Sequence, residues 1–428
     1  MTDTTQDRYL IISSDTHAGL PTEQYRPYVD PGYRDAFDDM IRQRQGENLA
    51  SSISDPEFAD KWLEEQKEGI SGAWDVAKRD KELDTDGVVA EVIFPDGDAV
   101  TGFTGAPFGA GLSSTGALEP GLAMAGARAH NRWLAELCAE SPARRGGVAI
   151  TPVLDDPAAA VEEAEWAAEH GLRGVLIPAM TAPYPHYHDA RYEPFWAACA
   201  DLQLPVHTHS GVAPQDDYGG HLALYLMEVR WWAARPLSFL MWTGVFERHP
   251  NLRFGVTESG AYWVPDLLWL MDTRFHHAHT SKKIKHGAII GELKMPPSVY
   301  FDRNCFIGAS TPERFEIERR YMIGVDTFLW GNDFPHPEGT WPHTREWLQS
   351  SFHDVPVDET RRMLGLNAAR VYGFDLDQLS GLADRIGPTP ADLGQADDTA
   401  NQAKWKEARD SGRFWLKQYR EQRQGVPA

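Results

Sequence analysis

Carboxylate and imidazole side chains stand at the ends of four short apolar segments of this chain. They are, in chain order, Asp15, His17, His207, His209, Glu258, Asp333 and His336. Both kinds of side chain bind divalent metal ions. Residues two apart in an extended chain point to the same side, so Asp15 and His17 project together, as do His207 and His209. For any one pair an ordinary polar loop is the alternative, so the interpretation depends on whether the four segments meet.

Two imidazoles and two carboxylates of this group form the predicted metal site. Asp15, His17, His209 and Asp333 make a mixed nitrogen and oxygen set. Such a set suits one Zn²⁺ ion, with Mn²⁺ or Fe²⁺ as alternatives. Glu258 either completes the metal shell, acts as an acid or base, or pairs with a buried cation.

The other two histidines have alternative roles. Only one of His207 and His209 is expected to reach the metal, so His207 either holds substrate or fills the interior of the fold. We favour the interior for His207, but it stays among the catalytic candidates with Asp333 and Glu258. His336 is expected to contact substrate, and the alternative is a histidine that stabilises its loop between two prolines.

Eight apolar segments of strand length alternate with segments of helical pattern. The strands are predicted at about 8–14, 87–95, 147–151, 174–178, 204–209, 252–258, 300–306 and 327–333. Such alternation indicates an α/β fold with parallel strands and right-handed crossovers, and eight units close a (β/α)8 TIM barrel. An open doubly wound sheet is the alternative, but no Gly-rich phosphate loop follows the first segment. Active sites of such barrels lie at the carboxyl ends of the strands, which would bring the metal-binding side chains together.

The barrel is predicted to span residues 1–375, with an inserted polar region at about 20–73. Residues 376–428 form a C-terminal extension that includes an amphipathic helix at 403–421, packed on the barrel or on a partner subunit. The segment 97–118 is rich in Gly, Ser and Thr. It is either a loop beside the site or a simple linker.

Composition excludes several classes of function. The 428 residues carry a formal net charge of −22, which argues against binding to nucleic acid or to an anionic membrane. No apolar run approaches the roughly 18 residues of a transmembrane helix. The three cysteines lie far apart without C-x-x-C spacing, so we expect reduced thiols in a cytoplasmic protein.

The sequence resembles the amidohydrolase superfamily, in particular the amidohydrolase-related group that includes aminocarboxymuconate semialdehyde decarboxylase and γ-resorcylate decarboxylase. The resemblance rests on Ser14-Asp15-Thr16-His17, Trp74-Asp75 with Asp86-Gly87-Val88, Asn131-Arg132-Trp133-Leu134, Leu204-Pro205-Val206-His207-Thr208-His209, Phe246-Glu247-Arg248-His249-Pro250 and Gly331-Asn332-Asp333-Phe334-Pro335-His336. It implies a barrel with one divalent ion, held by Asp15, His17, His209 and Asp333. It also implies a homodimer or homotetramer.

One departure from the family directs the functional prediction. The decarboxylases of the group usually place a histidine where this chain has Glu258. A glutamate donates a proton near neutral pH only if its pKa is raised. We therefore first predict a hydrolase acting on an amide, ester or C–C bond beside a carbonyl, in which the metal lowers the pKa of a bound water to roughly 7.

Two rival functions stay open. The first is a non-oxidative decarboxylase of an aromatic or unsaturated carboxylic acid, with Arg230 and Arg303 as candidates for binding the substrate carboxylate. The second is a non-catalytic barrel that only binds a small molecule, which would predict degraded metal positions. The four ligand positions are intact, so the second rival ranks last.

Overall fold

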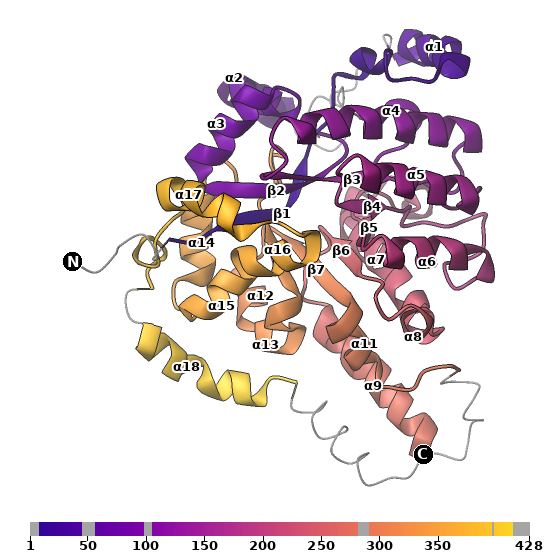
Figure 1. The fold of residues 1–428 in the computed structure, drawn as a ribbon. Coiled ribbons are helices and arrows are strands. Elements are labelled where there is room, and N and C mark those ends of the chain that lie inside the picture. Colours follow the sequence, from indigo (N-terminus) through magenta and orange to yellow (C-terminus); the bar gives the residue numbers. More distant parts are fainter. Residues whose placement is uncertain (1–7, 45–55, 98–104, 281–290, 396–397, 414–428) are drawn as a thin grey trace.

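Eight parallel strands form the centre of the molecule in the computed structural model (Figure 1). The structure describes residues 8–44, 56–97, 105–280, 291–395 and 398–413. The strands follow one another around the sheet in chain order, from β1 to β8. Backbone hydrogen bonds from Asp333 N to Asp15 O (2.9 Å) and from His17 N to Phe334 O (2.7 Å) join the two ends. The prediction of a (β/α)8 barrel is confirmed.

The strands are β1 (Ile11–His17), β2 (Val88–Phe94), β3 (Arg145–Ile150), β4 (Gly174–Leu176), β5 (Val206–His209), β6 (Phe254–Thr257), β7 (Cys305–Ser310) and β8 (Phe328–Gly331). The α-helices before β6 are α1 (Arg34–Arg44), α2 (Pro56–Ile70), α3 (Val76–Asp86), α4 (Pro120–Ala139), α5 (Pro157–Glu169), α6 (Glu193–Asp201), α7 (Leu222–Trp242) and α8 (Val245–Arg248). The later helices are α9 (Val264–Thr280), α11 (Pro297–Asn304), α12 (Arg314–Glu318), α13 (Arg320–Ile323), α14 (Thr344–Phe352), α15 (Val357–Arg361), α16 (Asn367–Tyr372), α17 (Leu376–Ile386) and α18 (Asp398–Ser411).

Local sequence signals explain how a helix delivers the chain to a strand. Asp75 accepts a hydrogen bond from the backbone N–H of Lys78 (3.1 Å) and so caps the start of α3. Gly87 ends the same helix in a left-handed conformation, with φ at 83°, and β2 begins at the next residue. All seven residues of β2 are buried, as expected for a parallel strand covered on both faces.

The prediction for the seventh strand is wrong in its position. The segment 300–306 was expected to be a strand, but α11 runs to Asn304 and β7 begins only at Cys305. Pro297 occupies the first turn of α11, where a proline favours a helix start. Tyr300 and Phe301 are therefore buried side chains of a helix. As a result, the carboxyl end of β7 is Ser310.

Helices outside the barrel repeat occupy both predicted additions. The polar region 20–73 contains α1 and α2, although residues 45–55 lie outside the described part of the chain. After residue 375, α17 buries Leu379 and Ala383 in one apolar cluster with β2. In α18, the indole N–H of Trp405 donates to Asp354 O at 2.8 Å. The helix predicted at 403–421 begins earlier, at Asp398, and residues 414–428 are not described.

Two further predictions concern the whole chain. Among the described residues, no helix is both long enough and apolar enough to cross a membrane. All three cysteines are buried and form no disulfide, as the prediction of reduced thiols requires.

Candidate metal centre

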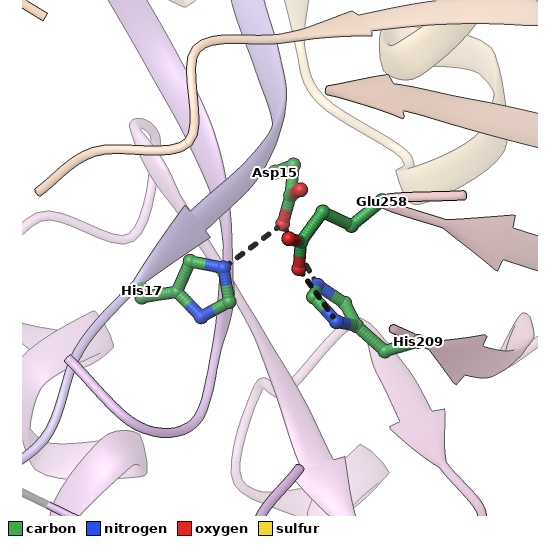
Figure 2. Close-up of side chains that lie close together, drawn as sticks. All are labelled: Asp15, His17, His209 and Glu258. Carbon is green, nitrogen blue, oxygen red and sulfur yellow. Dashed lines mark hydrogen bonds and ion pairs between the residues drawn. The ribbon is translucent and has the colours of Figure 1, made fainter. Parts of the chain in front are cut away.

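Four of the predicted side chains converge at the carboxyl end of the barrel (Figure 2). Asp15 and His17 come from β1, His209 ends β5, and Glu258 follows β6. Asp15 Oδ1 lies 3.4 Å from His17 Nε2 and 3.1 Å from His209 Nε2. Glu258 Oε2 lies 3.3 Å from His209 Nδ1. Side chains that are far apart in sequence therefore meet at the carboxyl ends of the strands, as predicted.

Asp333 approaches the same centre from the end of β8. Its Oδ1 lies 3.1 Å from His17 Nε2 and 3.1 Å from His336 Nδ1. The His336 ring is stacked on the His17 ring, with 3.9 Å between the centroids. Asp333 and Glu258 both have left-handed backbones, with φ at 59° and 53°. Such a conformation is costly for a residue other than glycine, and it is common at functional sites.

Both histidines of the predicted ligand set have their tautomer fixed from behind. His17 Nδ1 lies 2.8 Å from Pro95 O, and His209 Nδ1 lies 2.7 Å from Ser210 O. A carbonyl oxygen only accepts, so each Nδ1 carries the proton and donates it. Each Nε2 then presents its lone pair to the centre, which is the arrangement of metal-binding histidines.

The charges of the centre depend strongly on one another. Burial disfavours the charged form of Asp15, but the nearby His209 and His17 hold the pKa of Asp15 well below its usual range. Burial likewise opposes a charged His17, yet the close carboxylates of Asp15 and Asp333 raise its pKa well above the usual value. The neighbouring His336 has its pKa raised to about 9, because Asp333 outweighs burial and the repulsion from His17. In the metal-free protein, protons on the histidines therefore balance the negative charges of the carboxylates.

Glu258 differs from the other carboxylates of the centre. Burial and the negative charges of Asp333 and Asp15 raise its pKa to about 7, although the positive charge of His209 opposes this. Its side chain is 24% exposed, whereas Asp15 and His17 are fully buried. Glu258 therefore reaches the mouth of the centre and has the raised pKa that proton donation requires.

The residues present fit a divalent ion. Ligand atoms of Asp15, His17, His209 and Glu258 all lie within 4.8 Å of one another, and those of His17, Asp333 and His336 form a second such group. His17 Nε2 and Asp333 Oδ1 are buried and lack a well-formed hydrogen bond. Two buried imidazole nitrogens facing carboxylate oxygens are a donor set for Zn²⁺ or Mn²⁺.

A narrow cavity opens beside His209. One wall is formed by residues of the segment 110–114, and the rest of the lining comes from the ends of β3 and β4 and from the residues that follow β4. The lining residues are Ala110, Gly111, Leu112, Ser114, Ile150, Leu176, Ile177, Pro178, Ala179 and His209. Most of these side chains are apolar, so an apolar surface lies next to His209 of the predicted ligand set.

Two predicted site residues, His207 and Arg303, lie away from the centre. His207 is fully buried one layer deeper in the barrel, where the Phe94 ring lies 5.2 Å from it and the Tyr372 ring stacks on it at 5.7 Å. Burial lowers its pKa to about 3, so it is neutral. We therefore correct its place among the catalytic candidates and assign it to the barrel interior.

Of the two arginines predicted to bind a substrate carboxylate, Arg303 is misplaced, whereas Arg230 stays a prediction. Arg303 ends α11 and so precedes β7, at the opposite end of the barrel from the metal ligands. Its guanidinium donates to Phe246 O and to Asn304 Oδ1. Arg230 lies on the exposed face of α7. The error for Arg303 follows directly from the displaced start of β7.

The sequence interpretation also missed polar residues that support the centre. The Ser310 hydroxyl donates to Asp15 Oδ2. Ser13 Oγ donates to Asn332 Oδ1 at 2.8 Å and accepts from Asn332 N at 3.0 Å, which connects β1 to the end of β8. The correct end of β7 would have pointed to Ser310. Asn332 stands directly before Asp333 and was visible in the sequence.

Comparison with known proteins gives the family. Residues 91–374, about two thirds of the chain, match the family model described as amidohydrolase. The chain belongs to the amidohydrolase family. This amidohydrolase is 30% identical over 268 residues to γ-resorcylate decarboxylase of Rhodococcus jostii (strain RHA1), covering 58% of this chain and 77% of that protein. It is 29% identical over 274 residues to the enzyme of the same name from Rhizobium sp. (strain MTP-10005), covering 58% and 76%.

Solved structures share the fold of this amidohydrolase at lower identity. The crystal structure of 5-carboxyvanillate decarboxylase from Sphingomonas paucimobilis matches with a TM-score of 0.61 and 21% identity, covering 86% of this chain and all of that one. A dihydroxybenzoic acid decarboxylase from Polaromonas sp. JS666, with bound manganese and the inhibitor 2-nitroresorcinol, matches with a TM-score of 0.55 and 19% identity over 85% and 97%. The chain is an enzyme, and its relatives favour the decarboxylase over the hydrolase that we had predicted first.

Proposed function

We propose that this amidohydrolase is a metal-dependent decarboxylase that removes the carboxyl group of an aromatic acid without an oxidant. The observation that carries the proposal is the narrow apolar cavity directly beside His209. Its mostly apolar lining favours an aromatic ring at this position, with the ring carboxylate toward the ligand set. The names of the relatives support the same class of substrate.

The residues divide the work in the following way. Asp15, His17, His209 and Asp333 would hold the ion, which supplies positive charge to fix the substrate carboxylate. Glu258 donates a proton to the ring carbon that bears the carboxylate. The C–C bond then breaks, CO₂ leaves, and its electron pair restores the ring. Glu258 recovers its proton from solvent, since part of its side chain is exposed.

The nature of the ion is a further part of the proposal. The ligand set predicts Zn²⁺, and the manganese of the Polaromonas relative adds Mn²⁺ as an equal candidate. Reloading chelator-treated protein with each ion would rank the two by activity. From the sequence and the family resemblance alone, we also retain a cytoplasmic homodimer or homotetramer that binds neither nucleic acid nor membranes.

A substrate panel tests the reaction class. Metal-loaded enzyme would be incubated with hydroxybenzoates, including 2,6-dihydroxybenzoate, and with aryl amides and esters in ¹⁸O-labelled water. We expect CO₂ from at least one acid and no ¹⁸O in any aromatic product. Labelled products from the amides or esters, without CO₂ from the acids, would instead establish the hydrolase.

A further inference from the structure

Asp96 follows β2, and its carboxylate accepts hydrogen bonds from the backbone of the segment 106–112. Its Oδ1 accepts a hydrogen bond from Ala106 N at 3.0 Å, and its Oδ2 accepts one from Leu112 N at 2.6 Å. Its backbone is left-handed, with φ at 67°. Aspartate and asparagine tolerate this conformation better than most residues. One carboxylate therefore fixes both ends of the segment 106–112.

That segment leads directly into a wall of the cavity beside His209. Ala110, Gly111 and Leu112 all line the cavity. On its other side the wall packs closely against the residues after β5, because a Cβ built at Gly211 would lie 2.8 Å from Leu112 Cβ. The position of the wall therefore sets the width of the cavity.

Gly111 shows how closely the wall approaches Asp96. A Cβ built at Gly111 would lie 2.6 Å from Asp96 Cγ, nearer than real Cβ atoms come to other atoms. The backbone of Gly111 is not left-handed, so the lack of space, and not its conformation, requires glycine. The close packing between the wall and the Asp96 carboxylate therefore depends on both Gly111 and Asp96.

The main chain of Asp96 contacts the metal centre as well. Its carbonyl oxygen lies 3.0 Å from His336 Nε2, which donates to it. The other ring nitrogen, His336 Nδ1, lies 3.1 Å from Asp333 Oδ1. Asp96 is therefore the residue through which the wall of the cavity and the ligand Asp333 are held in fixed relative positions.

We propose that Asp96 is a positioning residue that sets the width of the cavity and so determines which ring acids the enzyme accepts. The chemical class of the ligand rests on the proposed function, whereas the anchoring of the wall does not. Loss of the carboxylate frees the wall, which then admits bulkier rings and orients the preferred ring less well.

A double-mutant cycle tests the specificity role. Asp96→Gly removes the carboxylate and keeps the left-handed backbone, and Gly111→Ala forces the wall away from Asp96. We expect each single variant to lower kcat/KM for the best ring acid about tenfold and to reduce its preference over bulkier analogues, at unchanged metal content. Because the clash needs the carboxylate, Gly111→Ala should add nothing in the Asp96→Gly background. Additive losses, or an unchanged preference, would overturn the proposal.

Hydrogen exchange tests the anchoring without any substrate. In Asp96→Gly and in the shape-conserving Asp96→Asn, we expect faster amide exchange in peptides that cover residues 105–114 and unchanged exchange in β5 and β6. Asp375 likewise accepts two backbone N–H groups, at the start of α17, so Asp375→Asn is the matched control. Unchanged exchange at 105–114 would refute the anchoring. Faster exchange with no turnover of ring acids would refute only the proposed function.

Discussion

The Glu258 carboxyl group reaches the mouth of the metal centre from the end of β6, 3.3 Å from His209. In the metal-free protein, burial and the nearby Asp333 raise the pKa of Glu258 to about 7. A protonated glutamate can therefore supply the proton that replaces the carboxyl group.

Substitution of Glu258 separates proton donation from metal binding. Glu258→Gln keeps the shape of the side chain but cannot supply the proton, so kcat should fall by about 10²- to 10⁴-fold. Metal content, measured by mass spectrometry, should stay at the wild-type level. Glu258→His should recover part of the activity. Loss of the metal in Glu258→Gln would instead make Glu258 a ligand.

Metal binding should depend on pH through His17. Its pKa in the metal-free protein is raised well above the usual value, because the close carboxylates of Asp15 and Asp333 outweigh burial. A metal ion must displace that proton, so the apparent affinity should rise by about tenfold per pH unit for each proton released between pH 6 and pH 8. Calorimetric titration with Mn²⁺ in buffers of different ionisation enthalpy measures the release. An affinity independent of pH would contradict this account.

Metal affinity should rise with pH, but the same raised pKa of His17 should make the metal-free fold less stable as the pH rises. The contribution of His17 is fully present below its unfolded pKa, and it is lost as the pH rises through the folded pKa. Thermal unfolding of chelated protein should therefore show less stability at high pH. The metal-loaded protein should show the reverse trend.

The position of strand β1 depends on a buried arginine. Arg79 of α3 uses all five of its N–H groups. Two go to Glu91 at 2.7 and 2.6 Å, one to Thr16 Oγ1 at 3.0 Å, one to His17 O at 2.9 Å and one to Gly72 O at 3.0 Å. These contacts therefore fix the carboxyl-terminal residues of β1, and His17 with them.

Arg79→Lys tests this support. Lysine keeps the charge but has three donors, so at least two of the five contacts are lost. We expect Mn²⁺ affinity to fall at least about tenfold and the free energy of unfolding to fall by about 1–3 kcal/mol. Arg320→Lys is the matched control, because Arg320 is also fully buried and pairs with Glu359 at 2.8 Å, away from the ligands. Equal losses of metal affinity in both variants would refute a specific role for Arg79.

The strand register shows where sequence reasoning succeeds and fails. Strand β2 is a mostly apolar run that stops directly before Pro95, so its position could be predicted closely. The prediction for β7 began at Tyr300 and Phe301, but these buried aromatic side chains belong to one face of α11. Periodicity cannot distinguish a buried strand from a short buried helix. That ambiguity misplaced Arg303 and hid Ser310.

At the scale of the whole molecule, the order of the strands made the ligand set predictable. Eight parallel strands in chain order place the ends of β1, β5, β6 and β8 around one centre, so the types of residue at those ends were sufficient. Asp96 could not be found in this way. Its role arises from backbone N–H groups of a loop, and no sequence pattern records which carboxylate a loop will meet.

The sequence alone also does not determine which reaction the enzyme catalyses. The metal ligands are compatible with hydrolysis and with decarboxylation, and the distinction depends on which atom receives the proton of Glu258. The relatives and the apolar cavity beside His209 favour protonation of a ring carbon. That step leaves a permanent isotopic trace when the solvent is labelled.

The most direct test is therefore turnover in D₂O. Metal-loaded enzyme would be supplied with the best ring acid of the panel, and the product would be examined by NMR and mass spectrometry. We predict one deuterium per product molecule, at the carbon that carried the carboxylate, with one CO₂ released for each. Solvent oxygen in the product, or an unlabelled carbon at that position, would contradict the proposed decarboxylase.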